Sequence, residues 1–163
     1  MLEKLVDLAH GKAELEEFTL LFLFAYAFLL RVPSEALPAT AVEGSHALRR
    51  EGDFLVFKLD RRKNRPEGSR LVRGCWCKES PKTCPLHKLS PLLERCQKGA
   101  RLFPNLNESN VIGTLRFMLK ALQVPKAEEY RTHDLRRGHA KDLQLSGERF
   151  ICDSHMLCKC CTC

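Results

Sequence analysis

The sequence lacks an apolar segment long enough to cross a bilayer. Its longest apolar run, Phe18 to Leu30, is shorter than the roughly 20 residues that a membrane-spanning helix requires. No secretory-signal pattern opens the sequence, because Met1 to Lys12 mixes charged and apolar residues, and no internal repeat is visible. We therefore interpret Phe18 to Leu30 as a buried helix within one core, and association with a membrane ranks last among the interpretations.

Acidic residues are outnumbered, so the formal net charge is +7 and the sequence pI is about 9.0. A basic balance suits a polyanionic partner, although charge alone does not separate nucleic acid from a membrane surface. Nine cysteines without a secretory pattern indicate reduced thiols or metal ligands instead of a disulfide framework. We expect an intracellular protein, nuclear if its source is eukaryotic.

The hydrophobic pattern predicts an α+β fold, a mainly helical single domain with a small three-stranded antiparallel sheet at one edge. A helix is expected over residues 13–31, since Pro33 disfavours helical geometry at Val32. Runs rich in β-formers predict strands at 46–50, 54–59 and 69–73. Further helices are expected from Ser90 onward and over residues 109–122, whose apolar stripe faces the core.

A cluster of candidate metal ligands follows the predicted sheet. Cys-x-Cys and Cys-x-x-His are spacings that can place four ligands around one tetrahedral zinc ion. The alternative is a set of reduced, partly buried cysteines that lie near a histidine by chance. The candidate ligands of a structural zinc ion are Cys75, Cys77, Cys84 and His87.

The stretch from Tyr130 to Leu145 is the most informative in the sequence. Thr132 is a candidate N-cap of a helix. Leu135, His139 and Leu143 then recur at the four-residue spacing of a helix that packs on a core.

The same helix carries a candidate phosphate site near its N-terminus. His133 and Arg136 would project from one face, with Arg137 beside them, where the positive helix end favours an anion. Gly138 costs about 1 kcal/mol relative to alanine inside a helix, which predicts that another group approaches closely there. The alternative is a solvated basic helix whose histidines cap or pack.

The longer string His133-Asp134-Leu135-Arg136-Arg137-Gly138-His139-Ala140 resembles the second signature motif of the tyrosine recombinases, the phage-integrase type. In that family His-x-x-Arg supplies a histidine and the second of two arginines that grip the scissile phosphate. The resemblance therefore assigns these roles to His133 and Arg136. The order of Arg-Lys-Asn, Gly-Ser, Arg-x-Cys-x-Cys and Cys-Pro-x-His also resembles the crypton-like recombinases of eukaryotic mobile elements.

The segment from Phe28 to Leu37 resembles the first motif of the same family, in which an arginine follows an apolar helix and precedes a Ser-Glu pair and a leucine. The match departs from the family at Val32-Pro33. On composition alone Arg31 is an ordinary cation that complements the C-terminal end of a helix dipole. The resemblance makes Arg31 the first phosphate-binding arginine.

Between the two motifs, the family carries a catalytic lysine in a hairpin turn. Lys63 matches that position best, and Lys58 is the second choice. The surrounding loop is densely basic, which fits either a solvated hairpin or contact with a phosphate backbone. The residues expected to contact DNA, besides the catalytic set, are Arg61, Arg62, Arg65 and Arg137.

The end of the sequence departs from the family. We divide the chain into an incomplete recombinase-like catalytic core, residues 1–147, and a divergent Cys-rich tail, residues 148–163. The family would place a third motif and then a nucleophilic tyrosine here, yet no tyrosine follows Tyr130. His155 lacks the surroundings of the third motif, and the tail could instead be a metal-binding tract.

The resemblance implies a core for DNA integration and recombination that binds double-stranded DNA, with a homo-oligomer assembled on the DNA. The family's reaction stores bond energy in a phosphotyrosine link and needs no cofactor for catalysis. Because the nucleophilic tyrosine is missing, we expect this chain to be cleavage-deficient as written. The alternative function is a small zinc-binding module that interacts with nucleic acid or protein.

Overall fold

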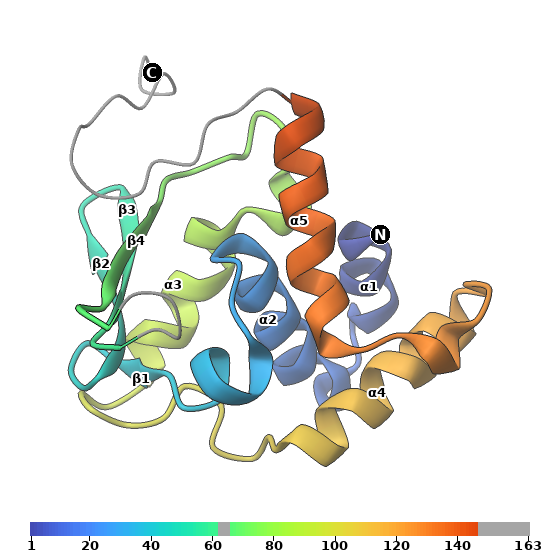
Figure 1. The fold of residues 1–163 in the computed structure, drawn as a ribbon, viewed down its shortest axis with the longest axis horizontal. Helices are drawn as coiled ribbons and strands as arrows, with labels where there is room; N and C mark the ends of the chain where they lie inside the picture. Colours follow the sequence, from blue (N-terminus) through green and yellow to red (C-terminus); the bar gives the residue numbers. More distant parts are fainter. Residues whose placement is uncertain (62–65, 147–163) are drawn as a thin grey trace.

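The computed structural model describes residues 1–61 and 66–146 of the chain. The Cys-rich tail, residues 148–163, lies outside the described residues. Figure 1 shows the sheet at one edge of the molecule and the helices gathered beside it. The helices are α1 (Leu2–Ala9), α2 (Ala13–Ala27), α3 (Pro85–Arg95), α4 (Glu108–Ala121) and α5 (Thr132–Ser146), with short helical turns η1 (Val32–Ala36), η2 (Pro81–Thr83) and η3 (Ala127–Glu129).

The sheet has four strands in the order β1-β2-β3-β4, namely β1 (Thr40–Ala41), β2 (His46–Glu51), β3 (Phe54–Leu59) and β4 (Ser69–Arg73). β2, β3 and β4 are antiparallel, as predicted. The prediction of three strands was wrong, because β1 adds a fourth strand that pairs parallel to β2. Two residues carry no periodic signal, so β1 is defined only by its hydrogen-bonded neighbours.

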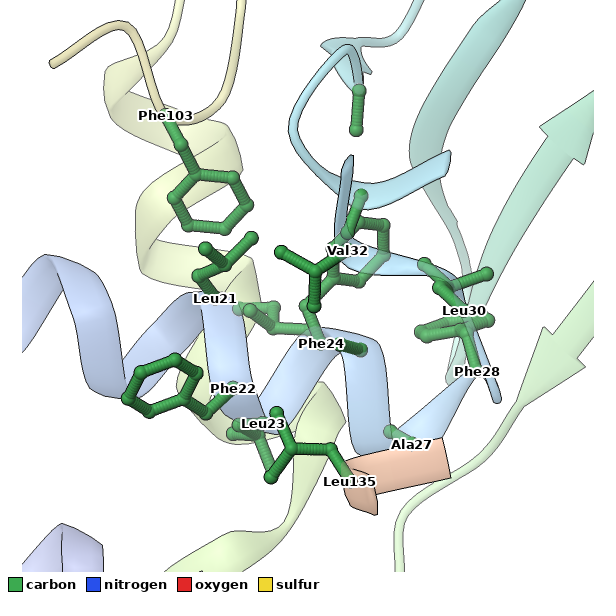
Figure 2. Close-up of a cluster of buried hydrophobic side chains, with 14 of the residues drawn as sticks. Leu21, Phe22, Leu23, Phe24, Ala27, Phe28, Leu30, Val32, Phe103 and Leu135 are labelled. Carbon is green, nitrogen blue, oxygen red and sulfur yellow. The ribbon is translucent and has the colours of Figure 1, made fainter. Parts of the chain in front are cut away.

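Helix α2 lies at the centre of the core. Its consecutive residues from Leu21 to Ala25 are all buried, as expected for a helix that is apolar on every side. The ring of Phe24 contacts three other rings, with centroids 5.4 Å from Phe28, 4.9 Å from Phe57 of β3 and 6.1 Å from Phe103. Figure 2 shows this cluster, to which α5 adds Leu135. The apolar run is therefore the element on which sheet and helices pack.

Helix α2 ends at Ala27, so the prediction that it continues to residue 31 was wrong. Leu29 adopts a left-handed conformation with φ of 56°. The N–H of Leu29 donates to Tyr26 O at 3.2 Å, and that of Leu30 donates to Ala25 O at 2.9 Å. These two bonds form a Schellman ending, which more often has glycine at the left-handed position. Arg31 consequently lies in extended backbone that leads into η1.

The later helices differ from prediction mainly at their starts. Helix α3 begins at Pro85 and contains Pro91, so it starts earlier than the predicted Ser90 because Cys84 and Pro85 form its N-terminus. Helix α4 is close to the predicted range. Asn107 caps it, through reciprocal side-chain bonds with Asn110.

Helix α5 begins at Thr132 itself, one residue earlier than an N-cap at Thr132 implies. The Asp134 carboxylate accepts a hydrogen bond from the backbone N–H of Arg131 at 2.8 Å, which closes the first turn. The space where a Cβ would stand at Gly138 is open among the described residues. The described part of the chain therefore does not make the predicted close approach at this glycine.

Among the described residues, no helix has the length and apolar character needed to cross a membrane.

Candidate metal centre and cationic pocket

Four candidate ligands converge beside the end of the sheet. Cys75 and Cys77 follow β4, while Cys84 precedes Pro85 at the start of α3 and His87 lies in the first turn of that helix. The four potential ligand atoms all lie within 4.8 Å of one another. The predicted clustering is confirmed, and the arrangement is one that could hold a metal ion.

Four of the six separations between the ligand atoms lie close to those of a tetrahedral site. His87 Nδ1 lies 3.7 Å from Cys75 Sγ, 3.1 Å from Cys77 Sγ and 3.2 Å from Cys84 Sγ. The Sγ atoms of Cys75 and Cys84 are 3.7 Å apart. Zinc bonds of about 2.3 Å to sulfur and about 2.0 Å to nitrogen imply about 3.8 Å between two sulfurs and about 3.5 Å between sulfur and nitrogen. The donor set and its spacing therefore suit Zn²⁺.

Hydrogen bonds to the sulfurs and nearby side chains hold the loop in place. The backbone N–H of Trp76 donates to Cys84 Sγ at 3.4 Å, and that of Cys77 donates to Cys75 Sγ at 3.4 Å. Trp76 Nε1 donates to the carbonyl oxygen of Thr83 at 2.6 Å. Such outer bonds orient ligands before a metal arrives. We call residues 74–87 the knuckle.

Two thiols of the knuckle differ in acidity. Burial raises the pKa of Cys77 to about 12, with help from hydrogen bonds to Cys75 and Cys84. Burial also opposes ionisation of Cys84, but hydrogen bonds from His87 and the backbone outweigh it and lower the pKa of that thiol to about 7. Cys84 is therefore the thiol of this pair that ionises first, and thiolate is the form that binds a metal.

The knuckle also reaches helix α5. The Trp76 ring stacks on the His139 ring, with centroids 6.1 Å apart and an angle of 28°. On another side, the Tyr26 ring meets His139 edge-on at 4.4 Å. Burial lowers the pKa of His139 to about 4, and the nearby Arg73 charge lowers it further against the opposing effect of Asp142. His139 is thus a neutral core side chain at neutral pH.

A separate pocket of about 410 Å³ brings the two recombinase-like motifs together. Arg31 from the first motif and His133 from the second both line it, although they are far apart in the sequence. Arg31 and the start of η1 supply one part of the lining, and α4, Arg131 and the start of α5 supply the rest. The complete lining is Arg31, Val32, Pro33, Ser34, Glu108, Ile112, Arg116, Arg131, Thr132 and His133.

Arg31 is held in the pocket wall by a buried acid. Glu35 is 3 % exposed, and its carboxylate accepts from the backbone N–H of Arg31 at 2.8 Å and from Nη1 at 3.2 Å. The first turn of η1 therefore aligns both the backbone and the guanidinium of Arg31.

Two pocket arginines were not predicted as site residues. Arg116 projects from α4, and its Nε donates to the carbonyl oxygen of Tyr130 at 3.1 Å. Arg131 immediately precedes α5. On the sequence, Arg116 is merely a polar residue of an amphipathic helix, so only tertiary packing could place it here. With Glu108 as the one acidic residue among those that line the pocket, its lining is net positive.

The remaining predicted residues are placed differently. Arg136 is partly buried and does not line the pocket. Arg137 is exposed, with Nη1 3.6 Å from Asp134 Oδ1, and Arg61 is exposed after β3. Arg62, Lys63 and Arg65 lie outside the described residues. The second choice for the catalytic lysine, Lys58, lies on β3 with Nζ 2.8 Å from Asp60 Oδ1 and does not line the pocket.

The pocket and the knuckle are thus the two places where the described residues gather chemically active groups. Comparison of the chain with protein families, with curated proteins and with solved structures gives no match.

Proposed function

We propose that this chain is the DNA-binding catalytic core of a tyrosine-recombinase-type protein, and that it is cleavage-deficient as written. One observation supports the proposal most directly. Arg31 and His133, which the two motif resemblances single out separately, line the same pocket. A DNA phosphodiester is the ligand that the proposal places there.

The chemistry of the pocket suits a phosphate. Arginine presents a fork of N–H donors that matches phosphate oxygens, and the N-terminal end of α5 adds its positive dipole. Arg116 and Arg131 would contribute two further guanidinium groups. In the recombinase reaction, such donors neutralise the charge that develops on the nonbridging oxygens, and His133 would handle proton transfer. Lys63 and Arg136 remain the other residues that the resemblance assigns to this reaction.

The two tyrosines of this sequence bear on the proposed cleavage deficiency. No tyrosine follows Tyr130 in the sequence. The Tyr26 hydroxyl donates to Asp142 Oδ2 at 2.6 Å, and burial followed by that carboxylate raises the pKa of Tyr26 above its ordinary value. A raised pKa is the opposite of what an activated nucleophile needs. Phosphate binding without a covalent step is the expected behaviour.

We further propose that the knuckle binds one structural Zn²⁺ through Cys75, Cys77, Cys84 and His87. Three soft thiolates and one imidazole form a closed four-ligand set, which is typical of structural zinc sites. The ion would supply folding energy to a loop that has little regular structure. It takes no part in the phosphate chemistry of the pocket.

Salt-dependent binding to duplex DNA tests the main proposal. The logarithm of the affinity should fall with the logarithm of the salt concentration, with a slope of about −0.9 for each neutralised phosphate. Arg31→Ala should weaken binding and reduce the magnitude of the slope by about one. Arg95→Ala is the matched control, because Arg95 is exposed on α3 and does not line the pocket. Equal behaviour of the two variants would contradict the pocket assignment.

A nicked suicide substrate tests cleavage deficiency. The purified chain should bind this DNA without forming a covalent adduct that survives denaturing electrophoresis. A covalent adduct would show that a nucleophile exists in the chain and would overturn this part of the proposal.

The second candidate function is a small zinc-binding module that interacts with nucleic acid or protein. The knuckle favours it, because four potential metal-ligand atoms there lie within 4.8 Å of one another. The two functions differ in their dependence on the pocket. Negligible duplex binding at low salt, combined with one tightly held zinc ion per chain, would favour the module.

A further inference from the structure

We propose that Trp76 is a positioning residue that couples the metal centre to helix α5 and thereby fixes one wall of the cationic pocket. This inference rests on the proposed function, because it takes the knuckle as a zinc site and the pocket as an anion site. It goes further by linking them through one aromatic side chain.

Trp76 is held on the knuckle by the metal ligands themselves. It lies between Cys75 and Cys77 in the sequence, and its backbone N–H donates to the sulfur of Cys84 at 3.4 Å. Its indole N–H donates to Thr83 O at 2.6 Å. A metal ion that draws these three sulfurs together therefore also sets the position and the tilt of the indole ring.

The indole ring then contacts the middle of α5. It stacks on His139 at 6.1 Å between centroids, and His139 is 5 % exposed. Tyr26 of α2 packs edge-on against the same imidazole at 4.4 Å, and its hydroxyl bonds to Asp142 one turn further along α5. The central part of α5 is thus held between the core helix α2 and the knuckle.

The same helix forms part of the pocket. Thr132 and His133 line the pocket at the N-terminal end of α5. His139 follows His133 by six residues, which is about 9 Å along a helix axis. A rigid helix transmits the position of its middle to its end over that distance. Loss of the contact at His139 should therefore loosen the wall that carries His133.

Hydrogen exchange of the zinc-bound protein provides the direct test. Trp76→Ala should retain zinc, because all four ligands remain, yet amides of α5 should exchange about two- to tenfold faster, as expected for the loss of one aromatic pair. Trp76→Phe restores a ring and should recover part of the protection. Amides of β2 and β3 serve as the internal control and should be unchanged.

His139→Leu removes the other ring of the contact between Trp76 and His139. It leaves the knuckle untouched, so zinc content is preserved even if Trp76→Ala disturbs the loop. α5 should loosen in this variant as well. The double variant should exchange no faster than His139→Leu alone, since His139→Leu already removes the contact with Trp76.

Zinc removal completes the test. Trp76 is the only tryptophan in the chain, so its fluorescence reports the knuckle directly and should change when a chelator removes the ion. In the wild-type protein α5 exchange should rise with that change, and affinity for duplex DNA should fall. In Trp76→Ala, zinc removal should leave α5 exchange unaltered.

The outcomes separate the two levels of the proposal. A protein that neither contains nor takes up zinc would overturn the metal centre, and this inference with it. Zinc binding with unchanged α5 exchange in both Trp76→Ala and His139→Leu would overturn the coupling alone. Loosened α5 with unchanged duplex affinity would overturn the link to the pocket, and would leave the metal centre standing.

Discussion

Glu35 grips Arg31 at two points, at the backbone N–H and at the guanidinium Nη1, with distances of 2.8 Å and 3.2 Å. The side chain of Glu35 is 4 % exposed, whereas that of Arg31 is 30 % exposed. The buried acid thus holds a cation that lines the pocket, which gives Glu35 a physical role.

Glu35→Gln should therefore change both stability and DNA binding. Loss of a charged, buried hydrogen-bond partner should lower the free energy of unfolding by about 1–3 kcal/mol, measured by denaturant titration. Duplex affinity should fall although the variant has one negative charge fewer, because Arg31 is less well oriented. Glu43→Gln at an exposed site makes the same change in net charge and should raise affinity slightly. Equal shifts in both variants would argue against the positioning role.

Cys84→Ser should abolish tight metal binding. The substitution removes one of four ligands and the sulfur that accepts the Trp76 N–H bond, so the thermal midpoint should also fall. Metal analysis of the purified proteins should show about one zinc ion fewer per chain in the variant than in the wild type. Cys96→Ser is the matched control, a partly buried thiol at the end of α3 outside the cluster. Equal zinc contents of the wild type and Cys84→Ser would exclude the four-ligand site.

His139 should make the fold sensitive to acid. Its pKa is about 4 in the folded protein against an ordinary value of 6.5, so the unfolded chain binds the proton more readily. The stability associated with neutral His139 is complete above about pH 6.5 and declines as the pH falls toward 4. By pH 5.5 the loss should be on the order of 1 kcal/mol.

His139→Phe provides the comparison for that acid sensitivity. It keeps a ring between Tyr26 and Trp76 but cannot titrate, while Arg73 and Asp142 remain nearby. The difference in unfolding free energy between variant and wild type should grow in favour of the variant as the pH is lowered from 7.5 to 5.5. A difference independent of pH would mean that His139 does not titrate below its ordinary range.

Gly138→Ala should stabilise the protein by about 0.5–1 kcal/mol, because glycine in a helix interior costs that much and the described residues leave space for a Cβ. Gly113→Ala in α4 meets open space as well and should give a similar gain. The two variants should differ only in DNA binding. If duplex DNA approaches α5 at Gly138, affinity falls in Gly138→Ala and not in Gly113→Ala, as measured in one salt series.

Local patterns predicted part of the fold well. The strands at 54–59 and 69–73 have the predicted bounds, since runs of β-formers bounded by turns are a short-range signal. Helix ends were less predictable. Leu29 adopts a left-handed conformation. A glycine at this position would have predicted the helix end, whereas a leucine does not. The sequence did not predict β1, because its pairing with β2 follows from tertiary contacts.

By itself, the sequence determined the cluster of candidate metal ligands, because all four residues lie within one short segment whose spacing restricts where their side chains can go. Tertiary structure alone decided the cationic pocket. Arg31, Arg116 and the pair Arg131 and His133 come from three separate parts of the chain. Only the packing of the helices around the shared apolar core brings these side chains to one place. A local sequence pattern predicts local geometry. Whether distant residues lie close together depends on how the apolar faces of whole helices and strands pack against one another.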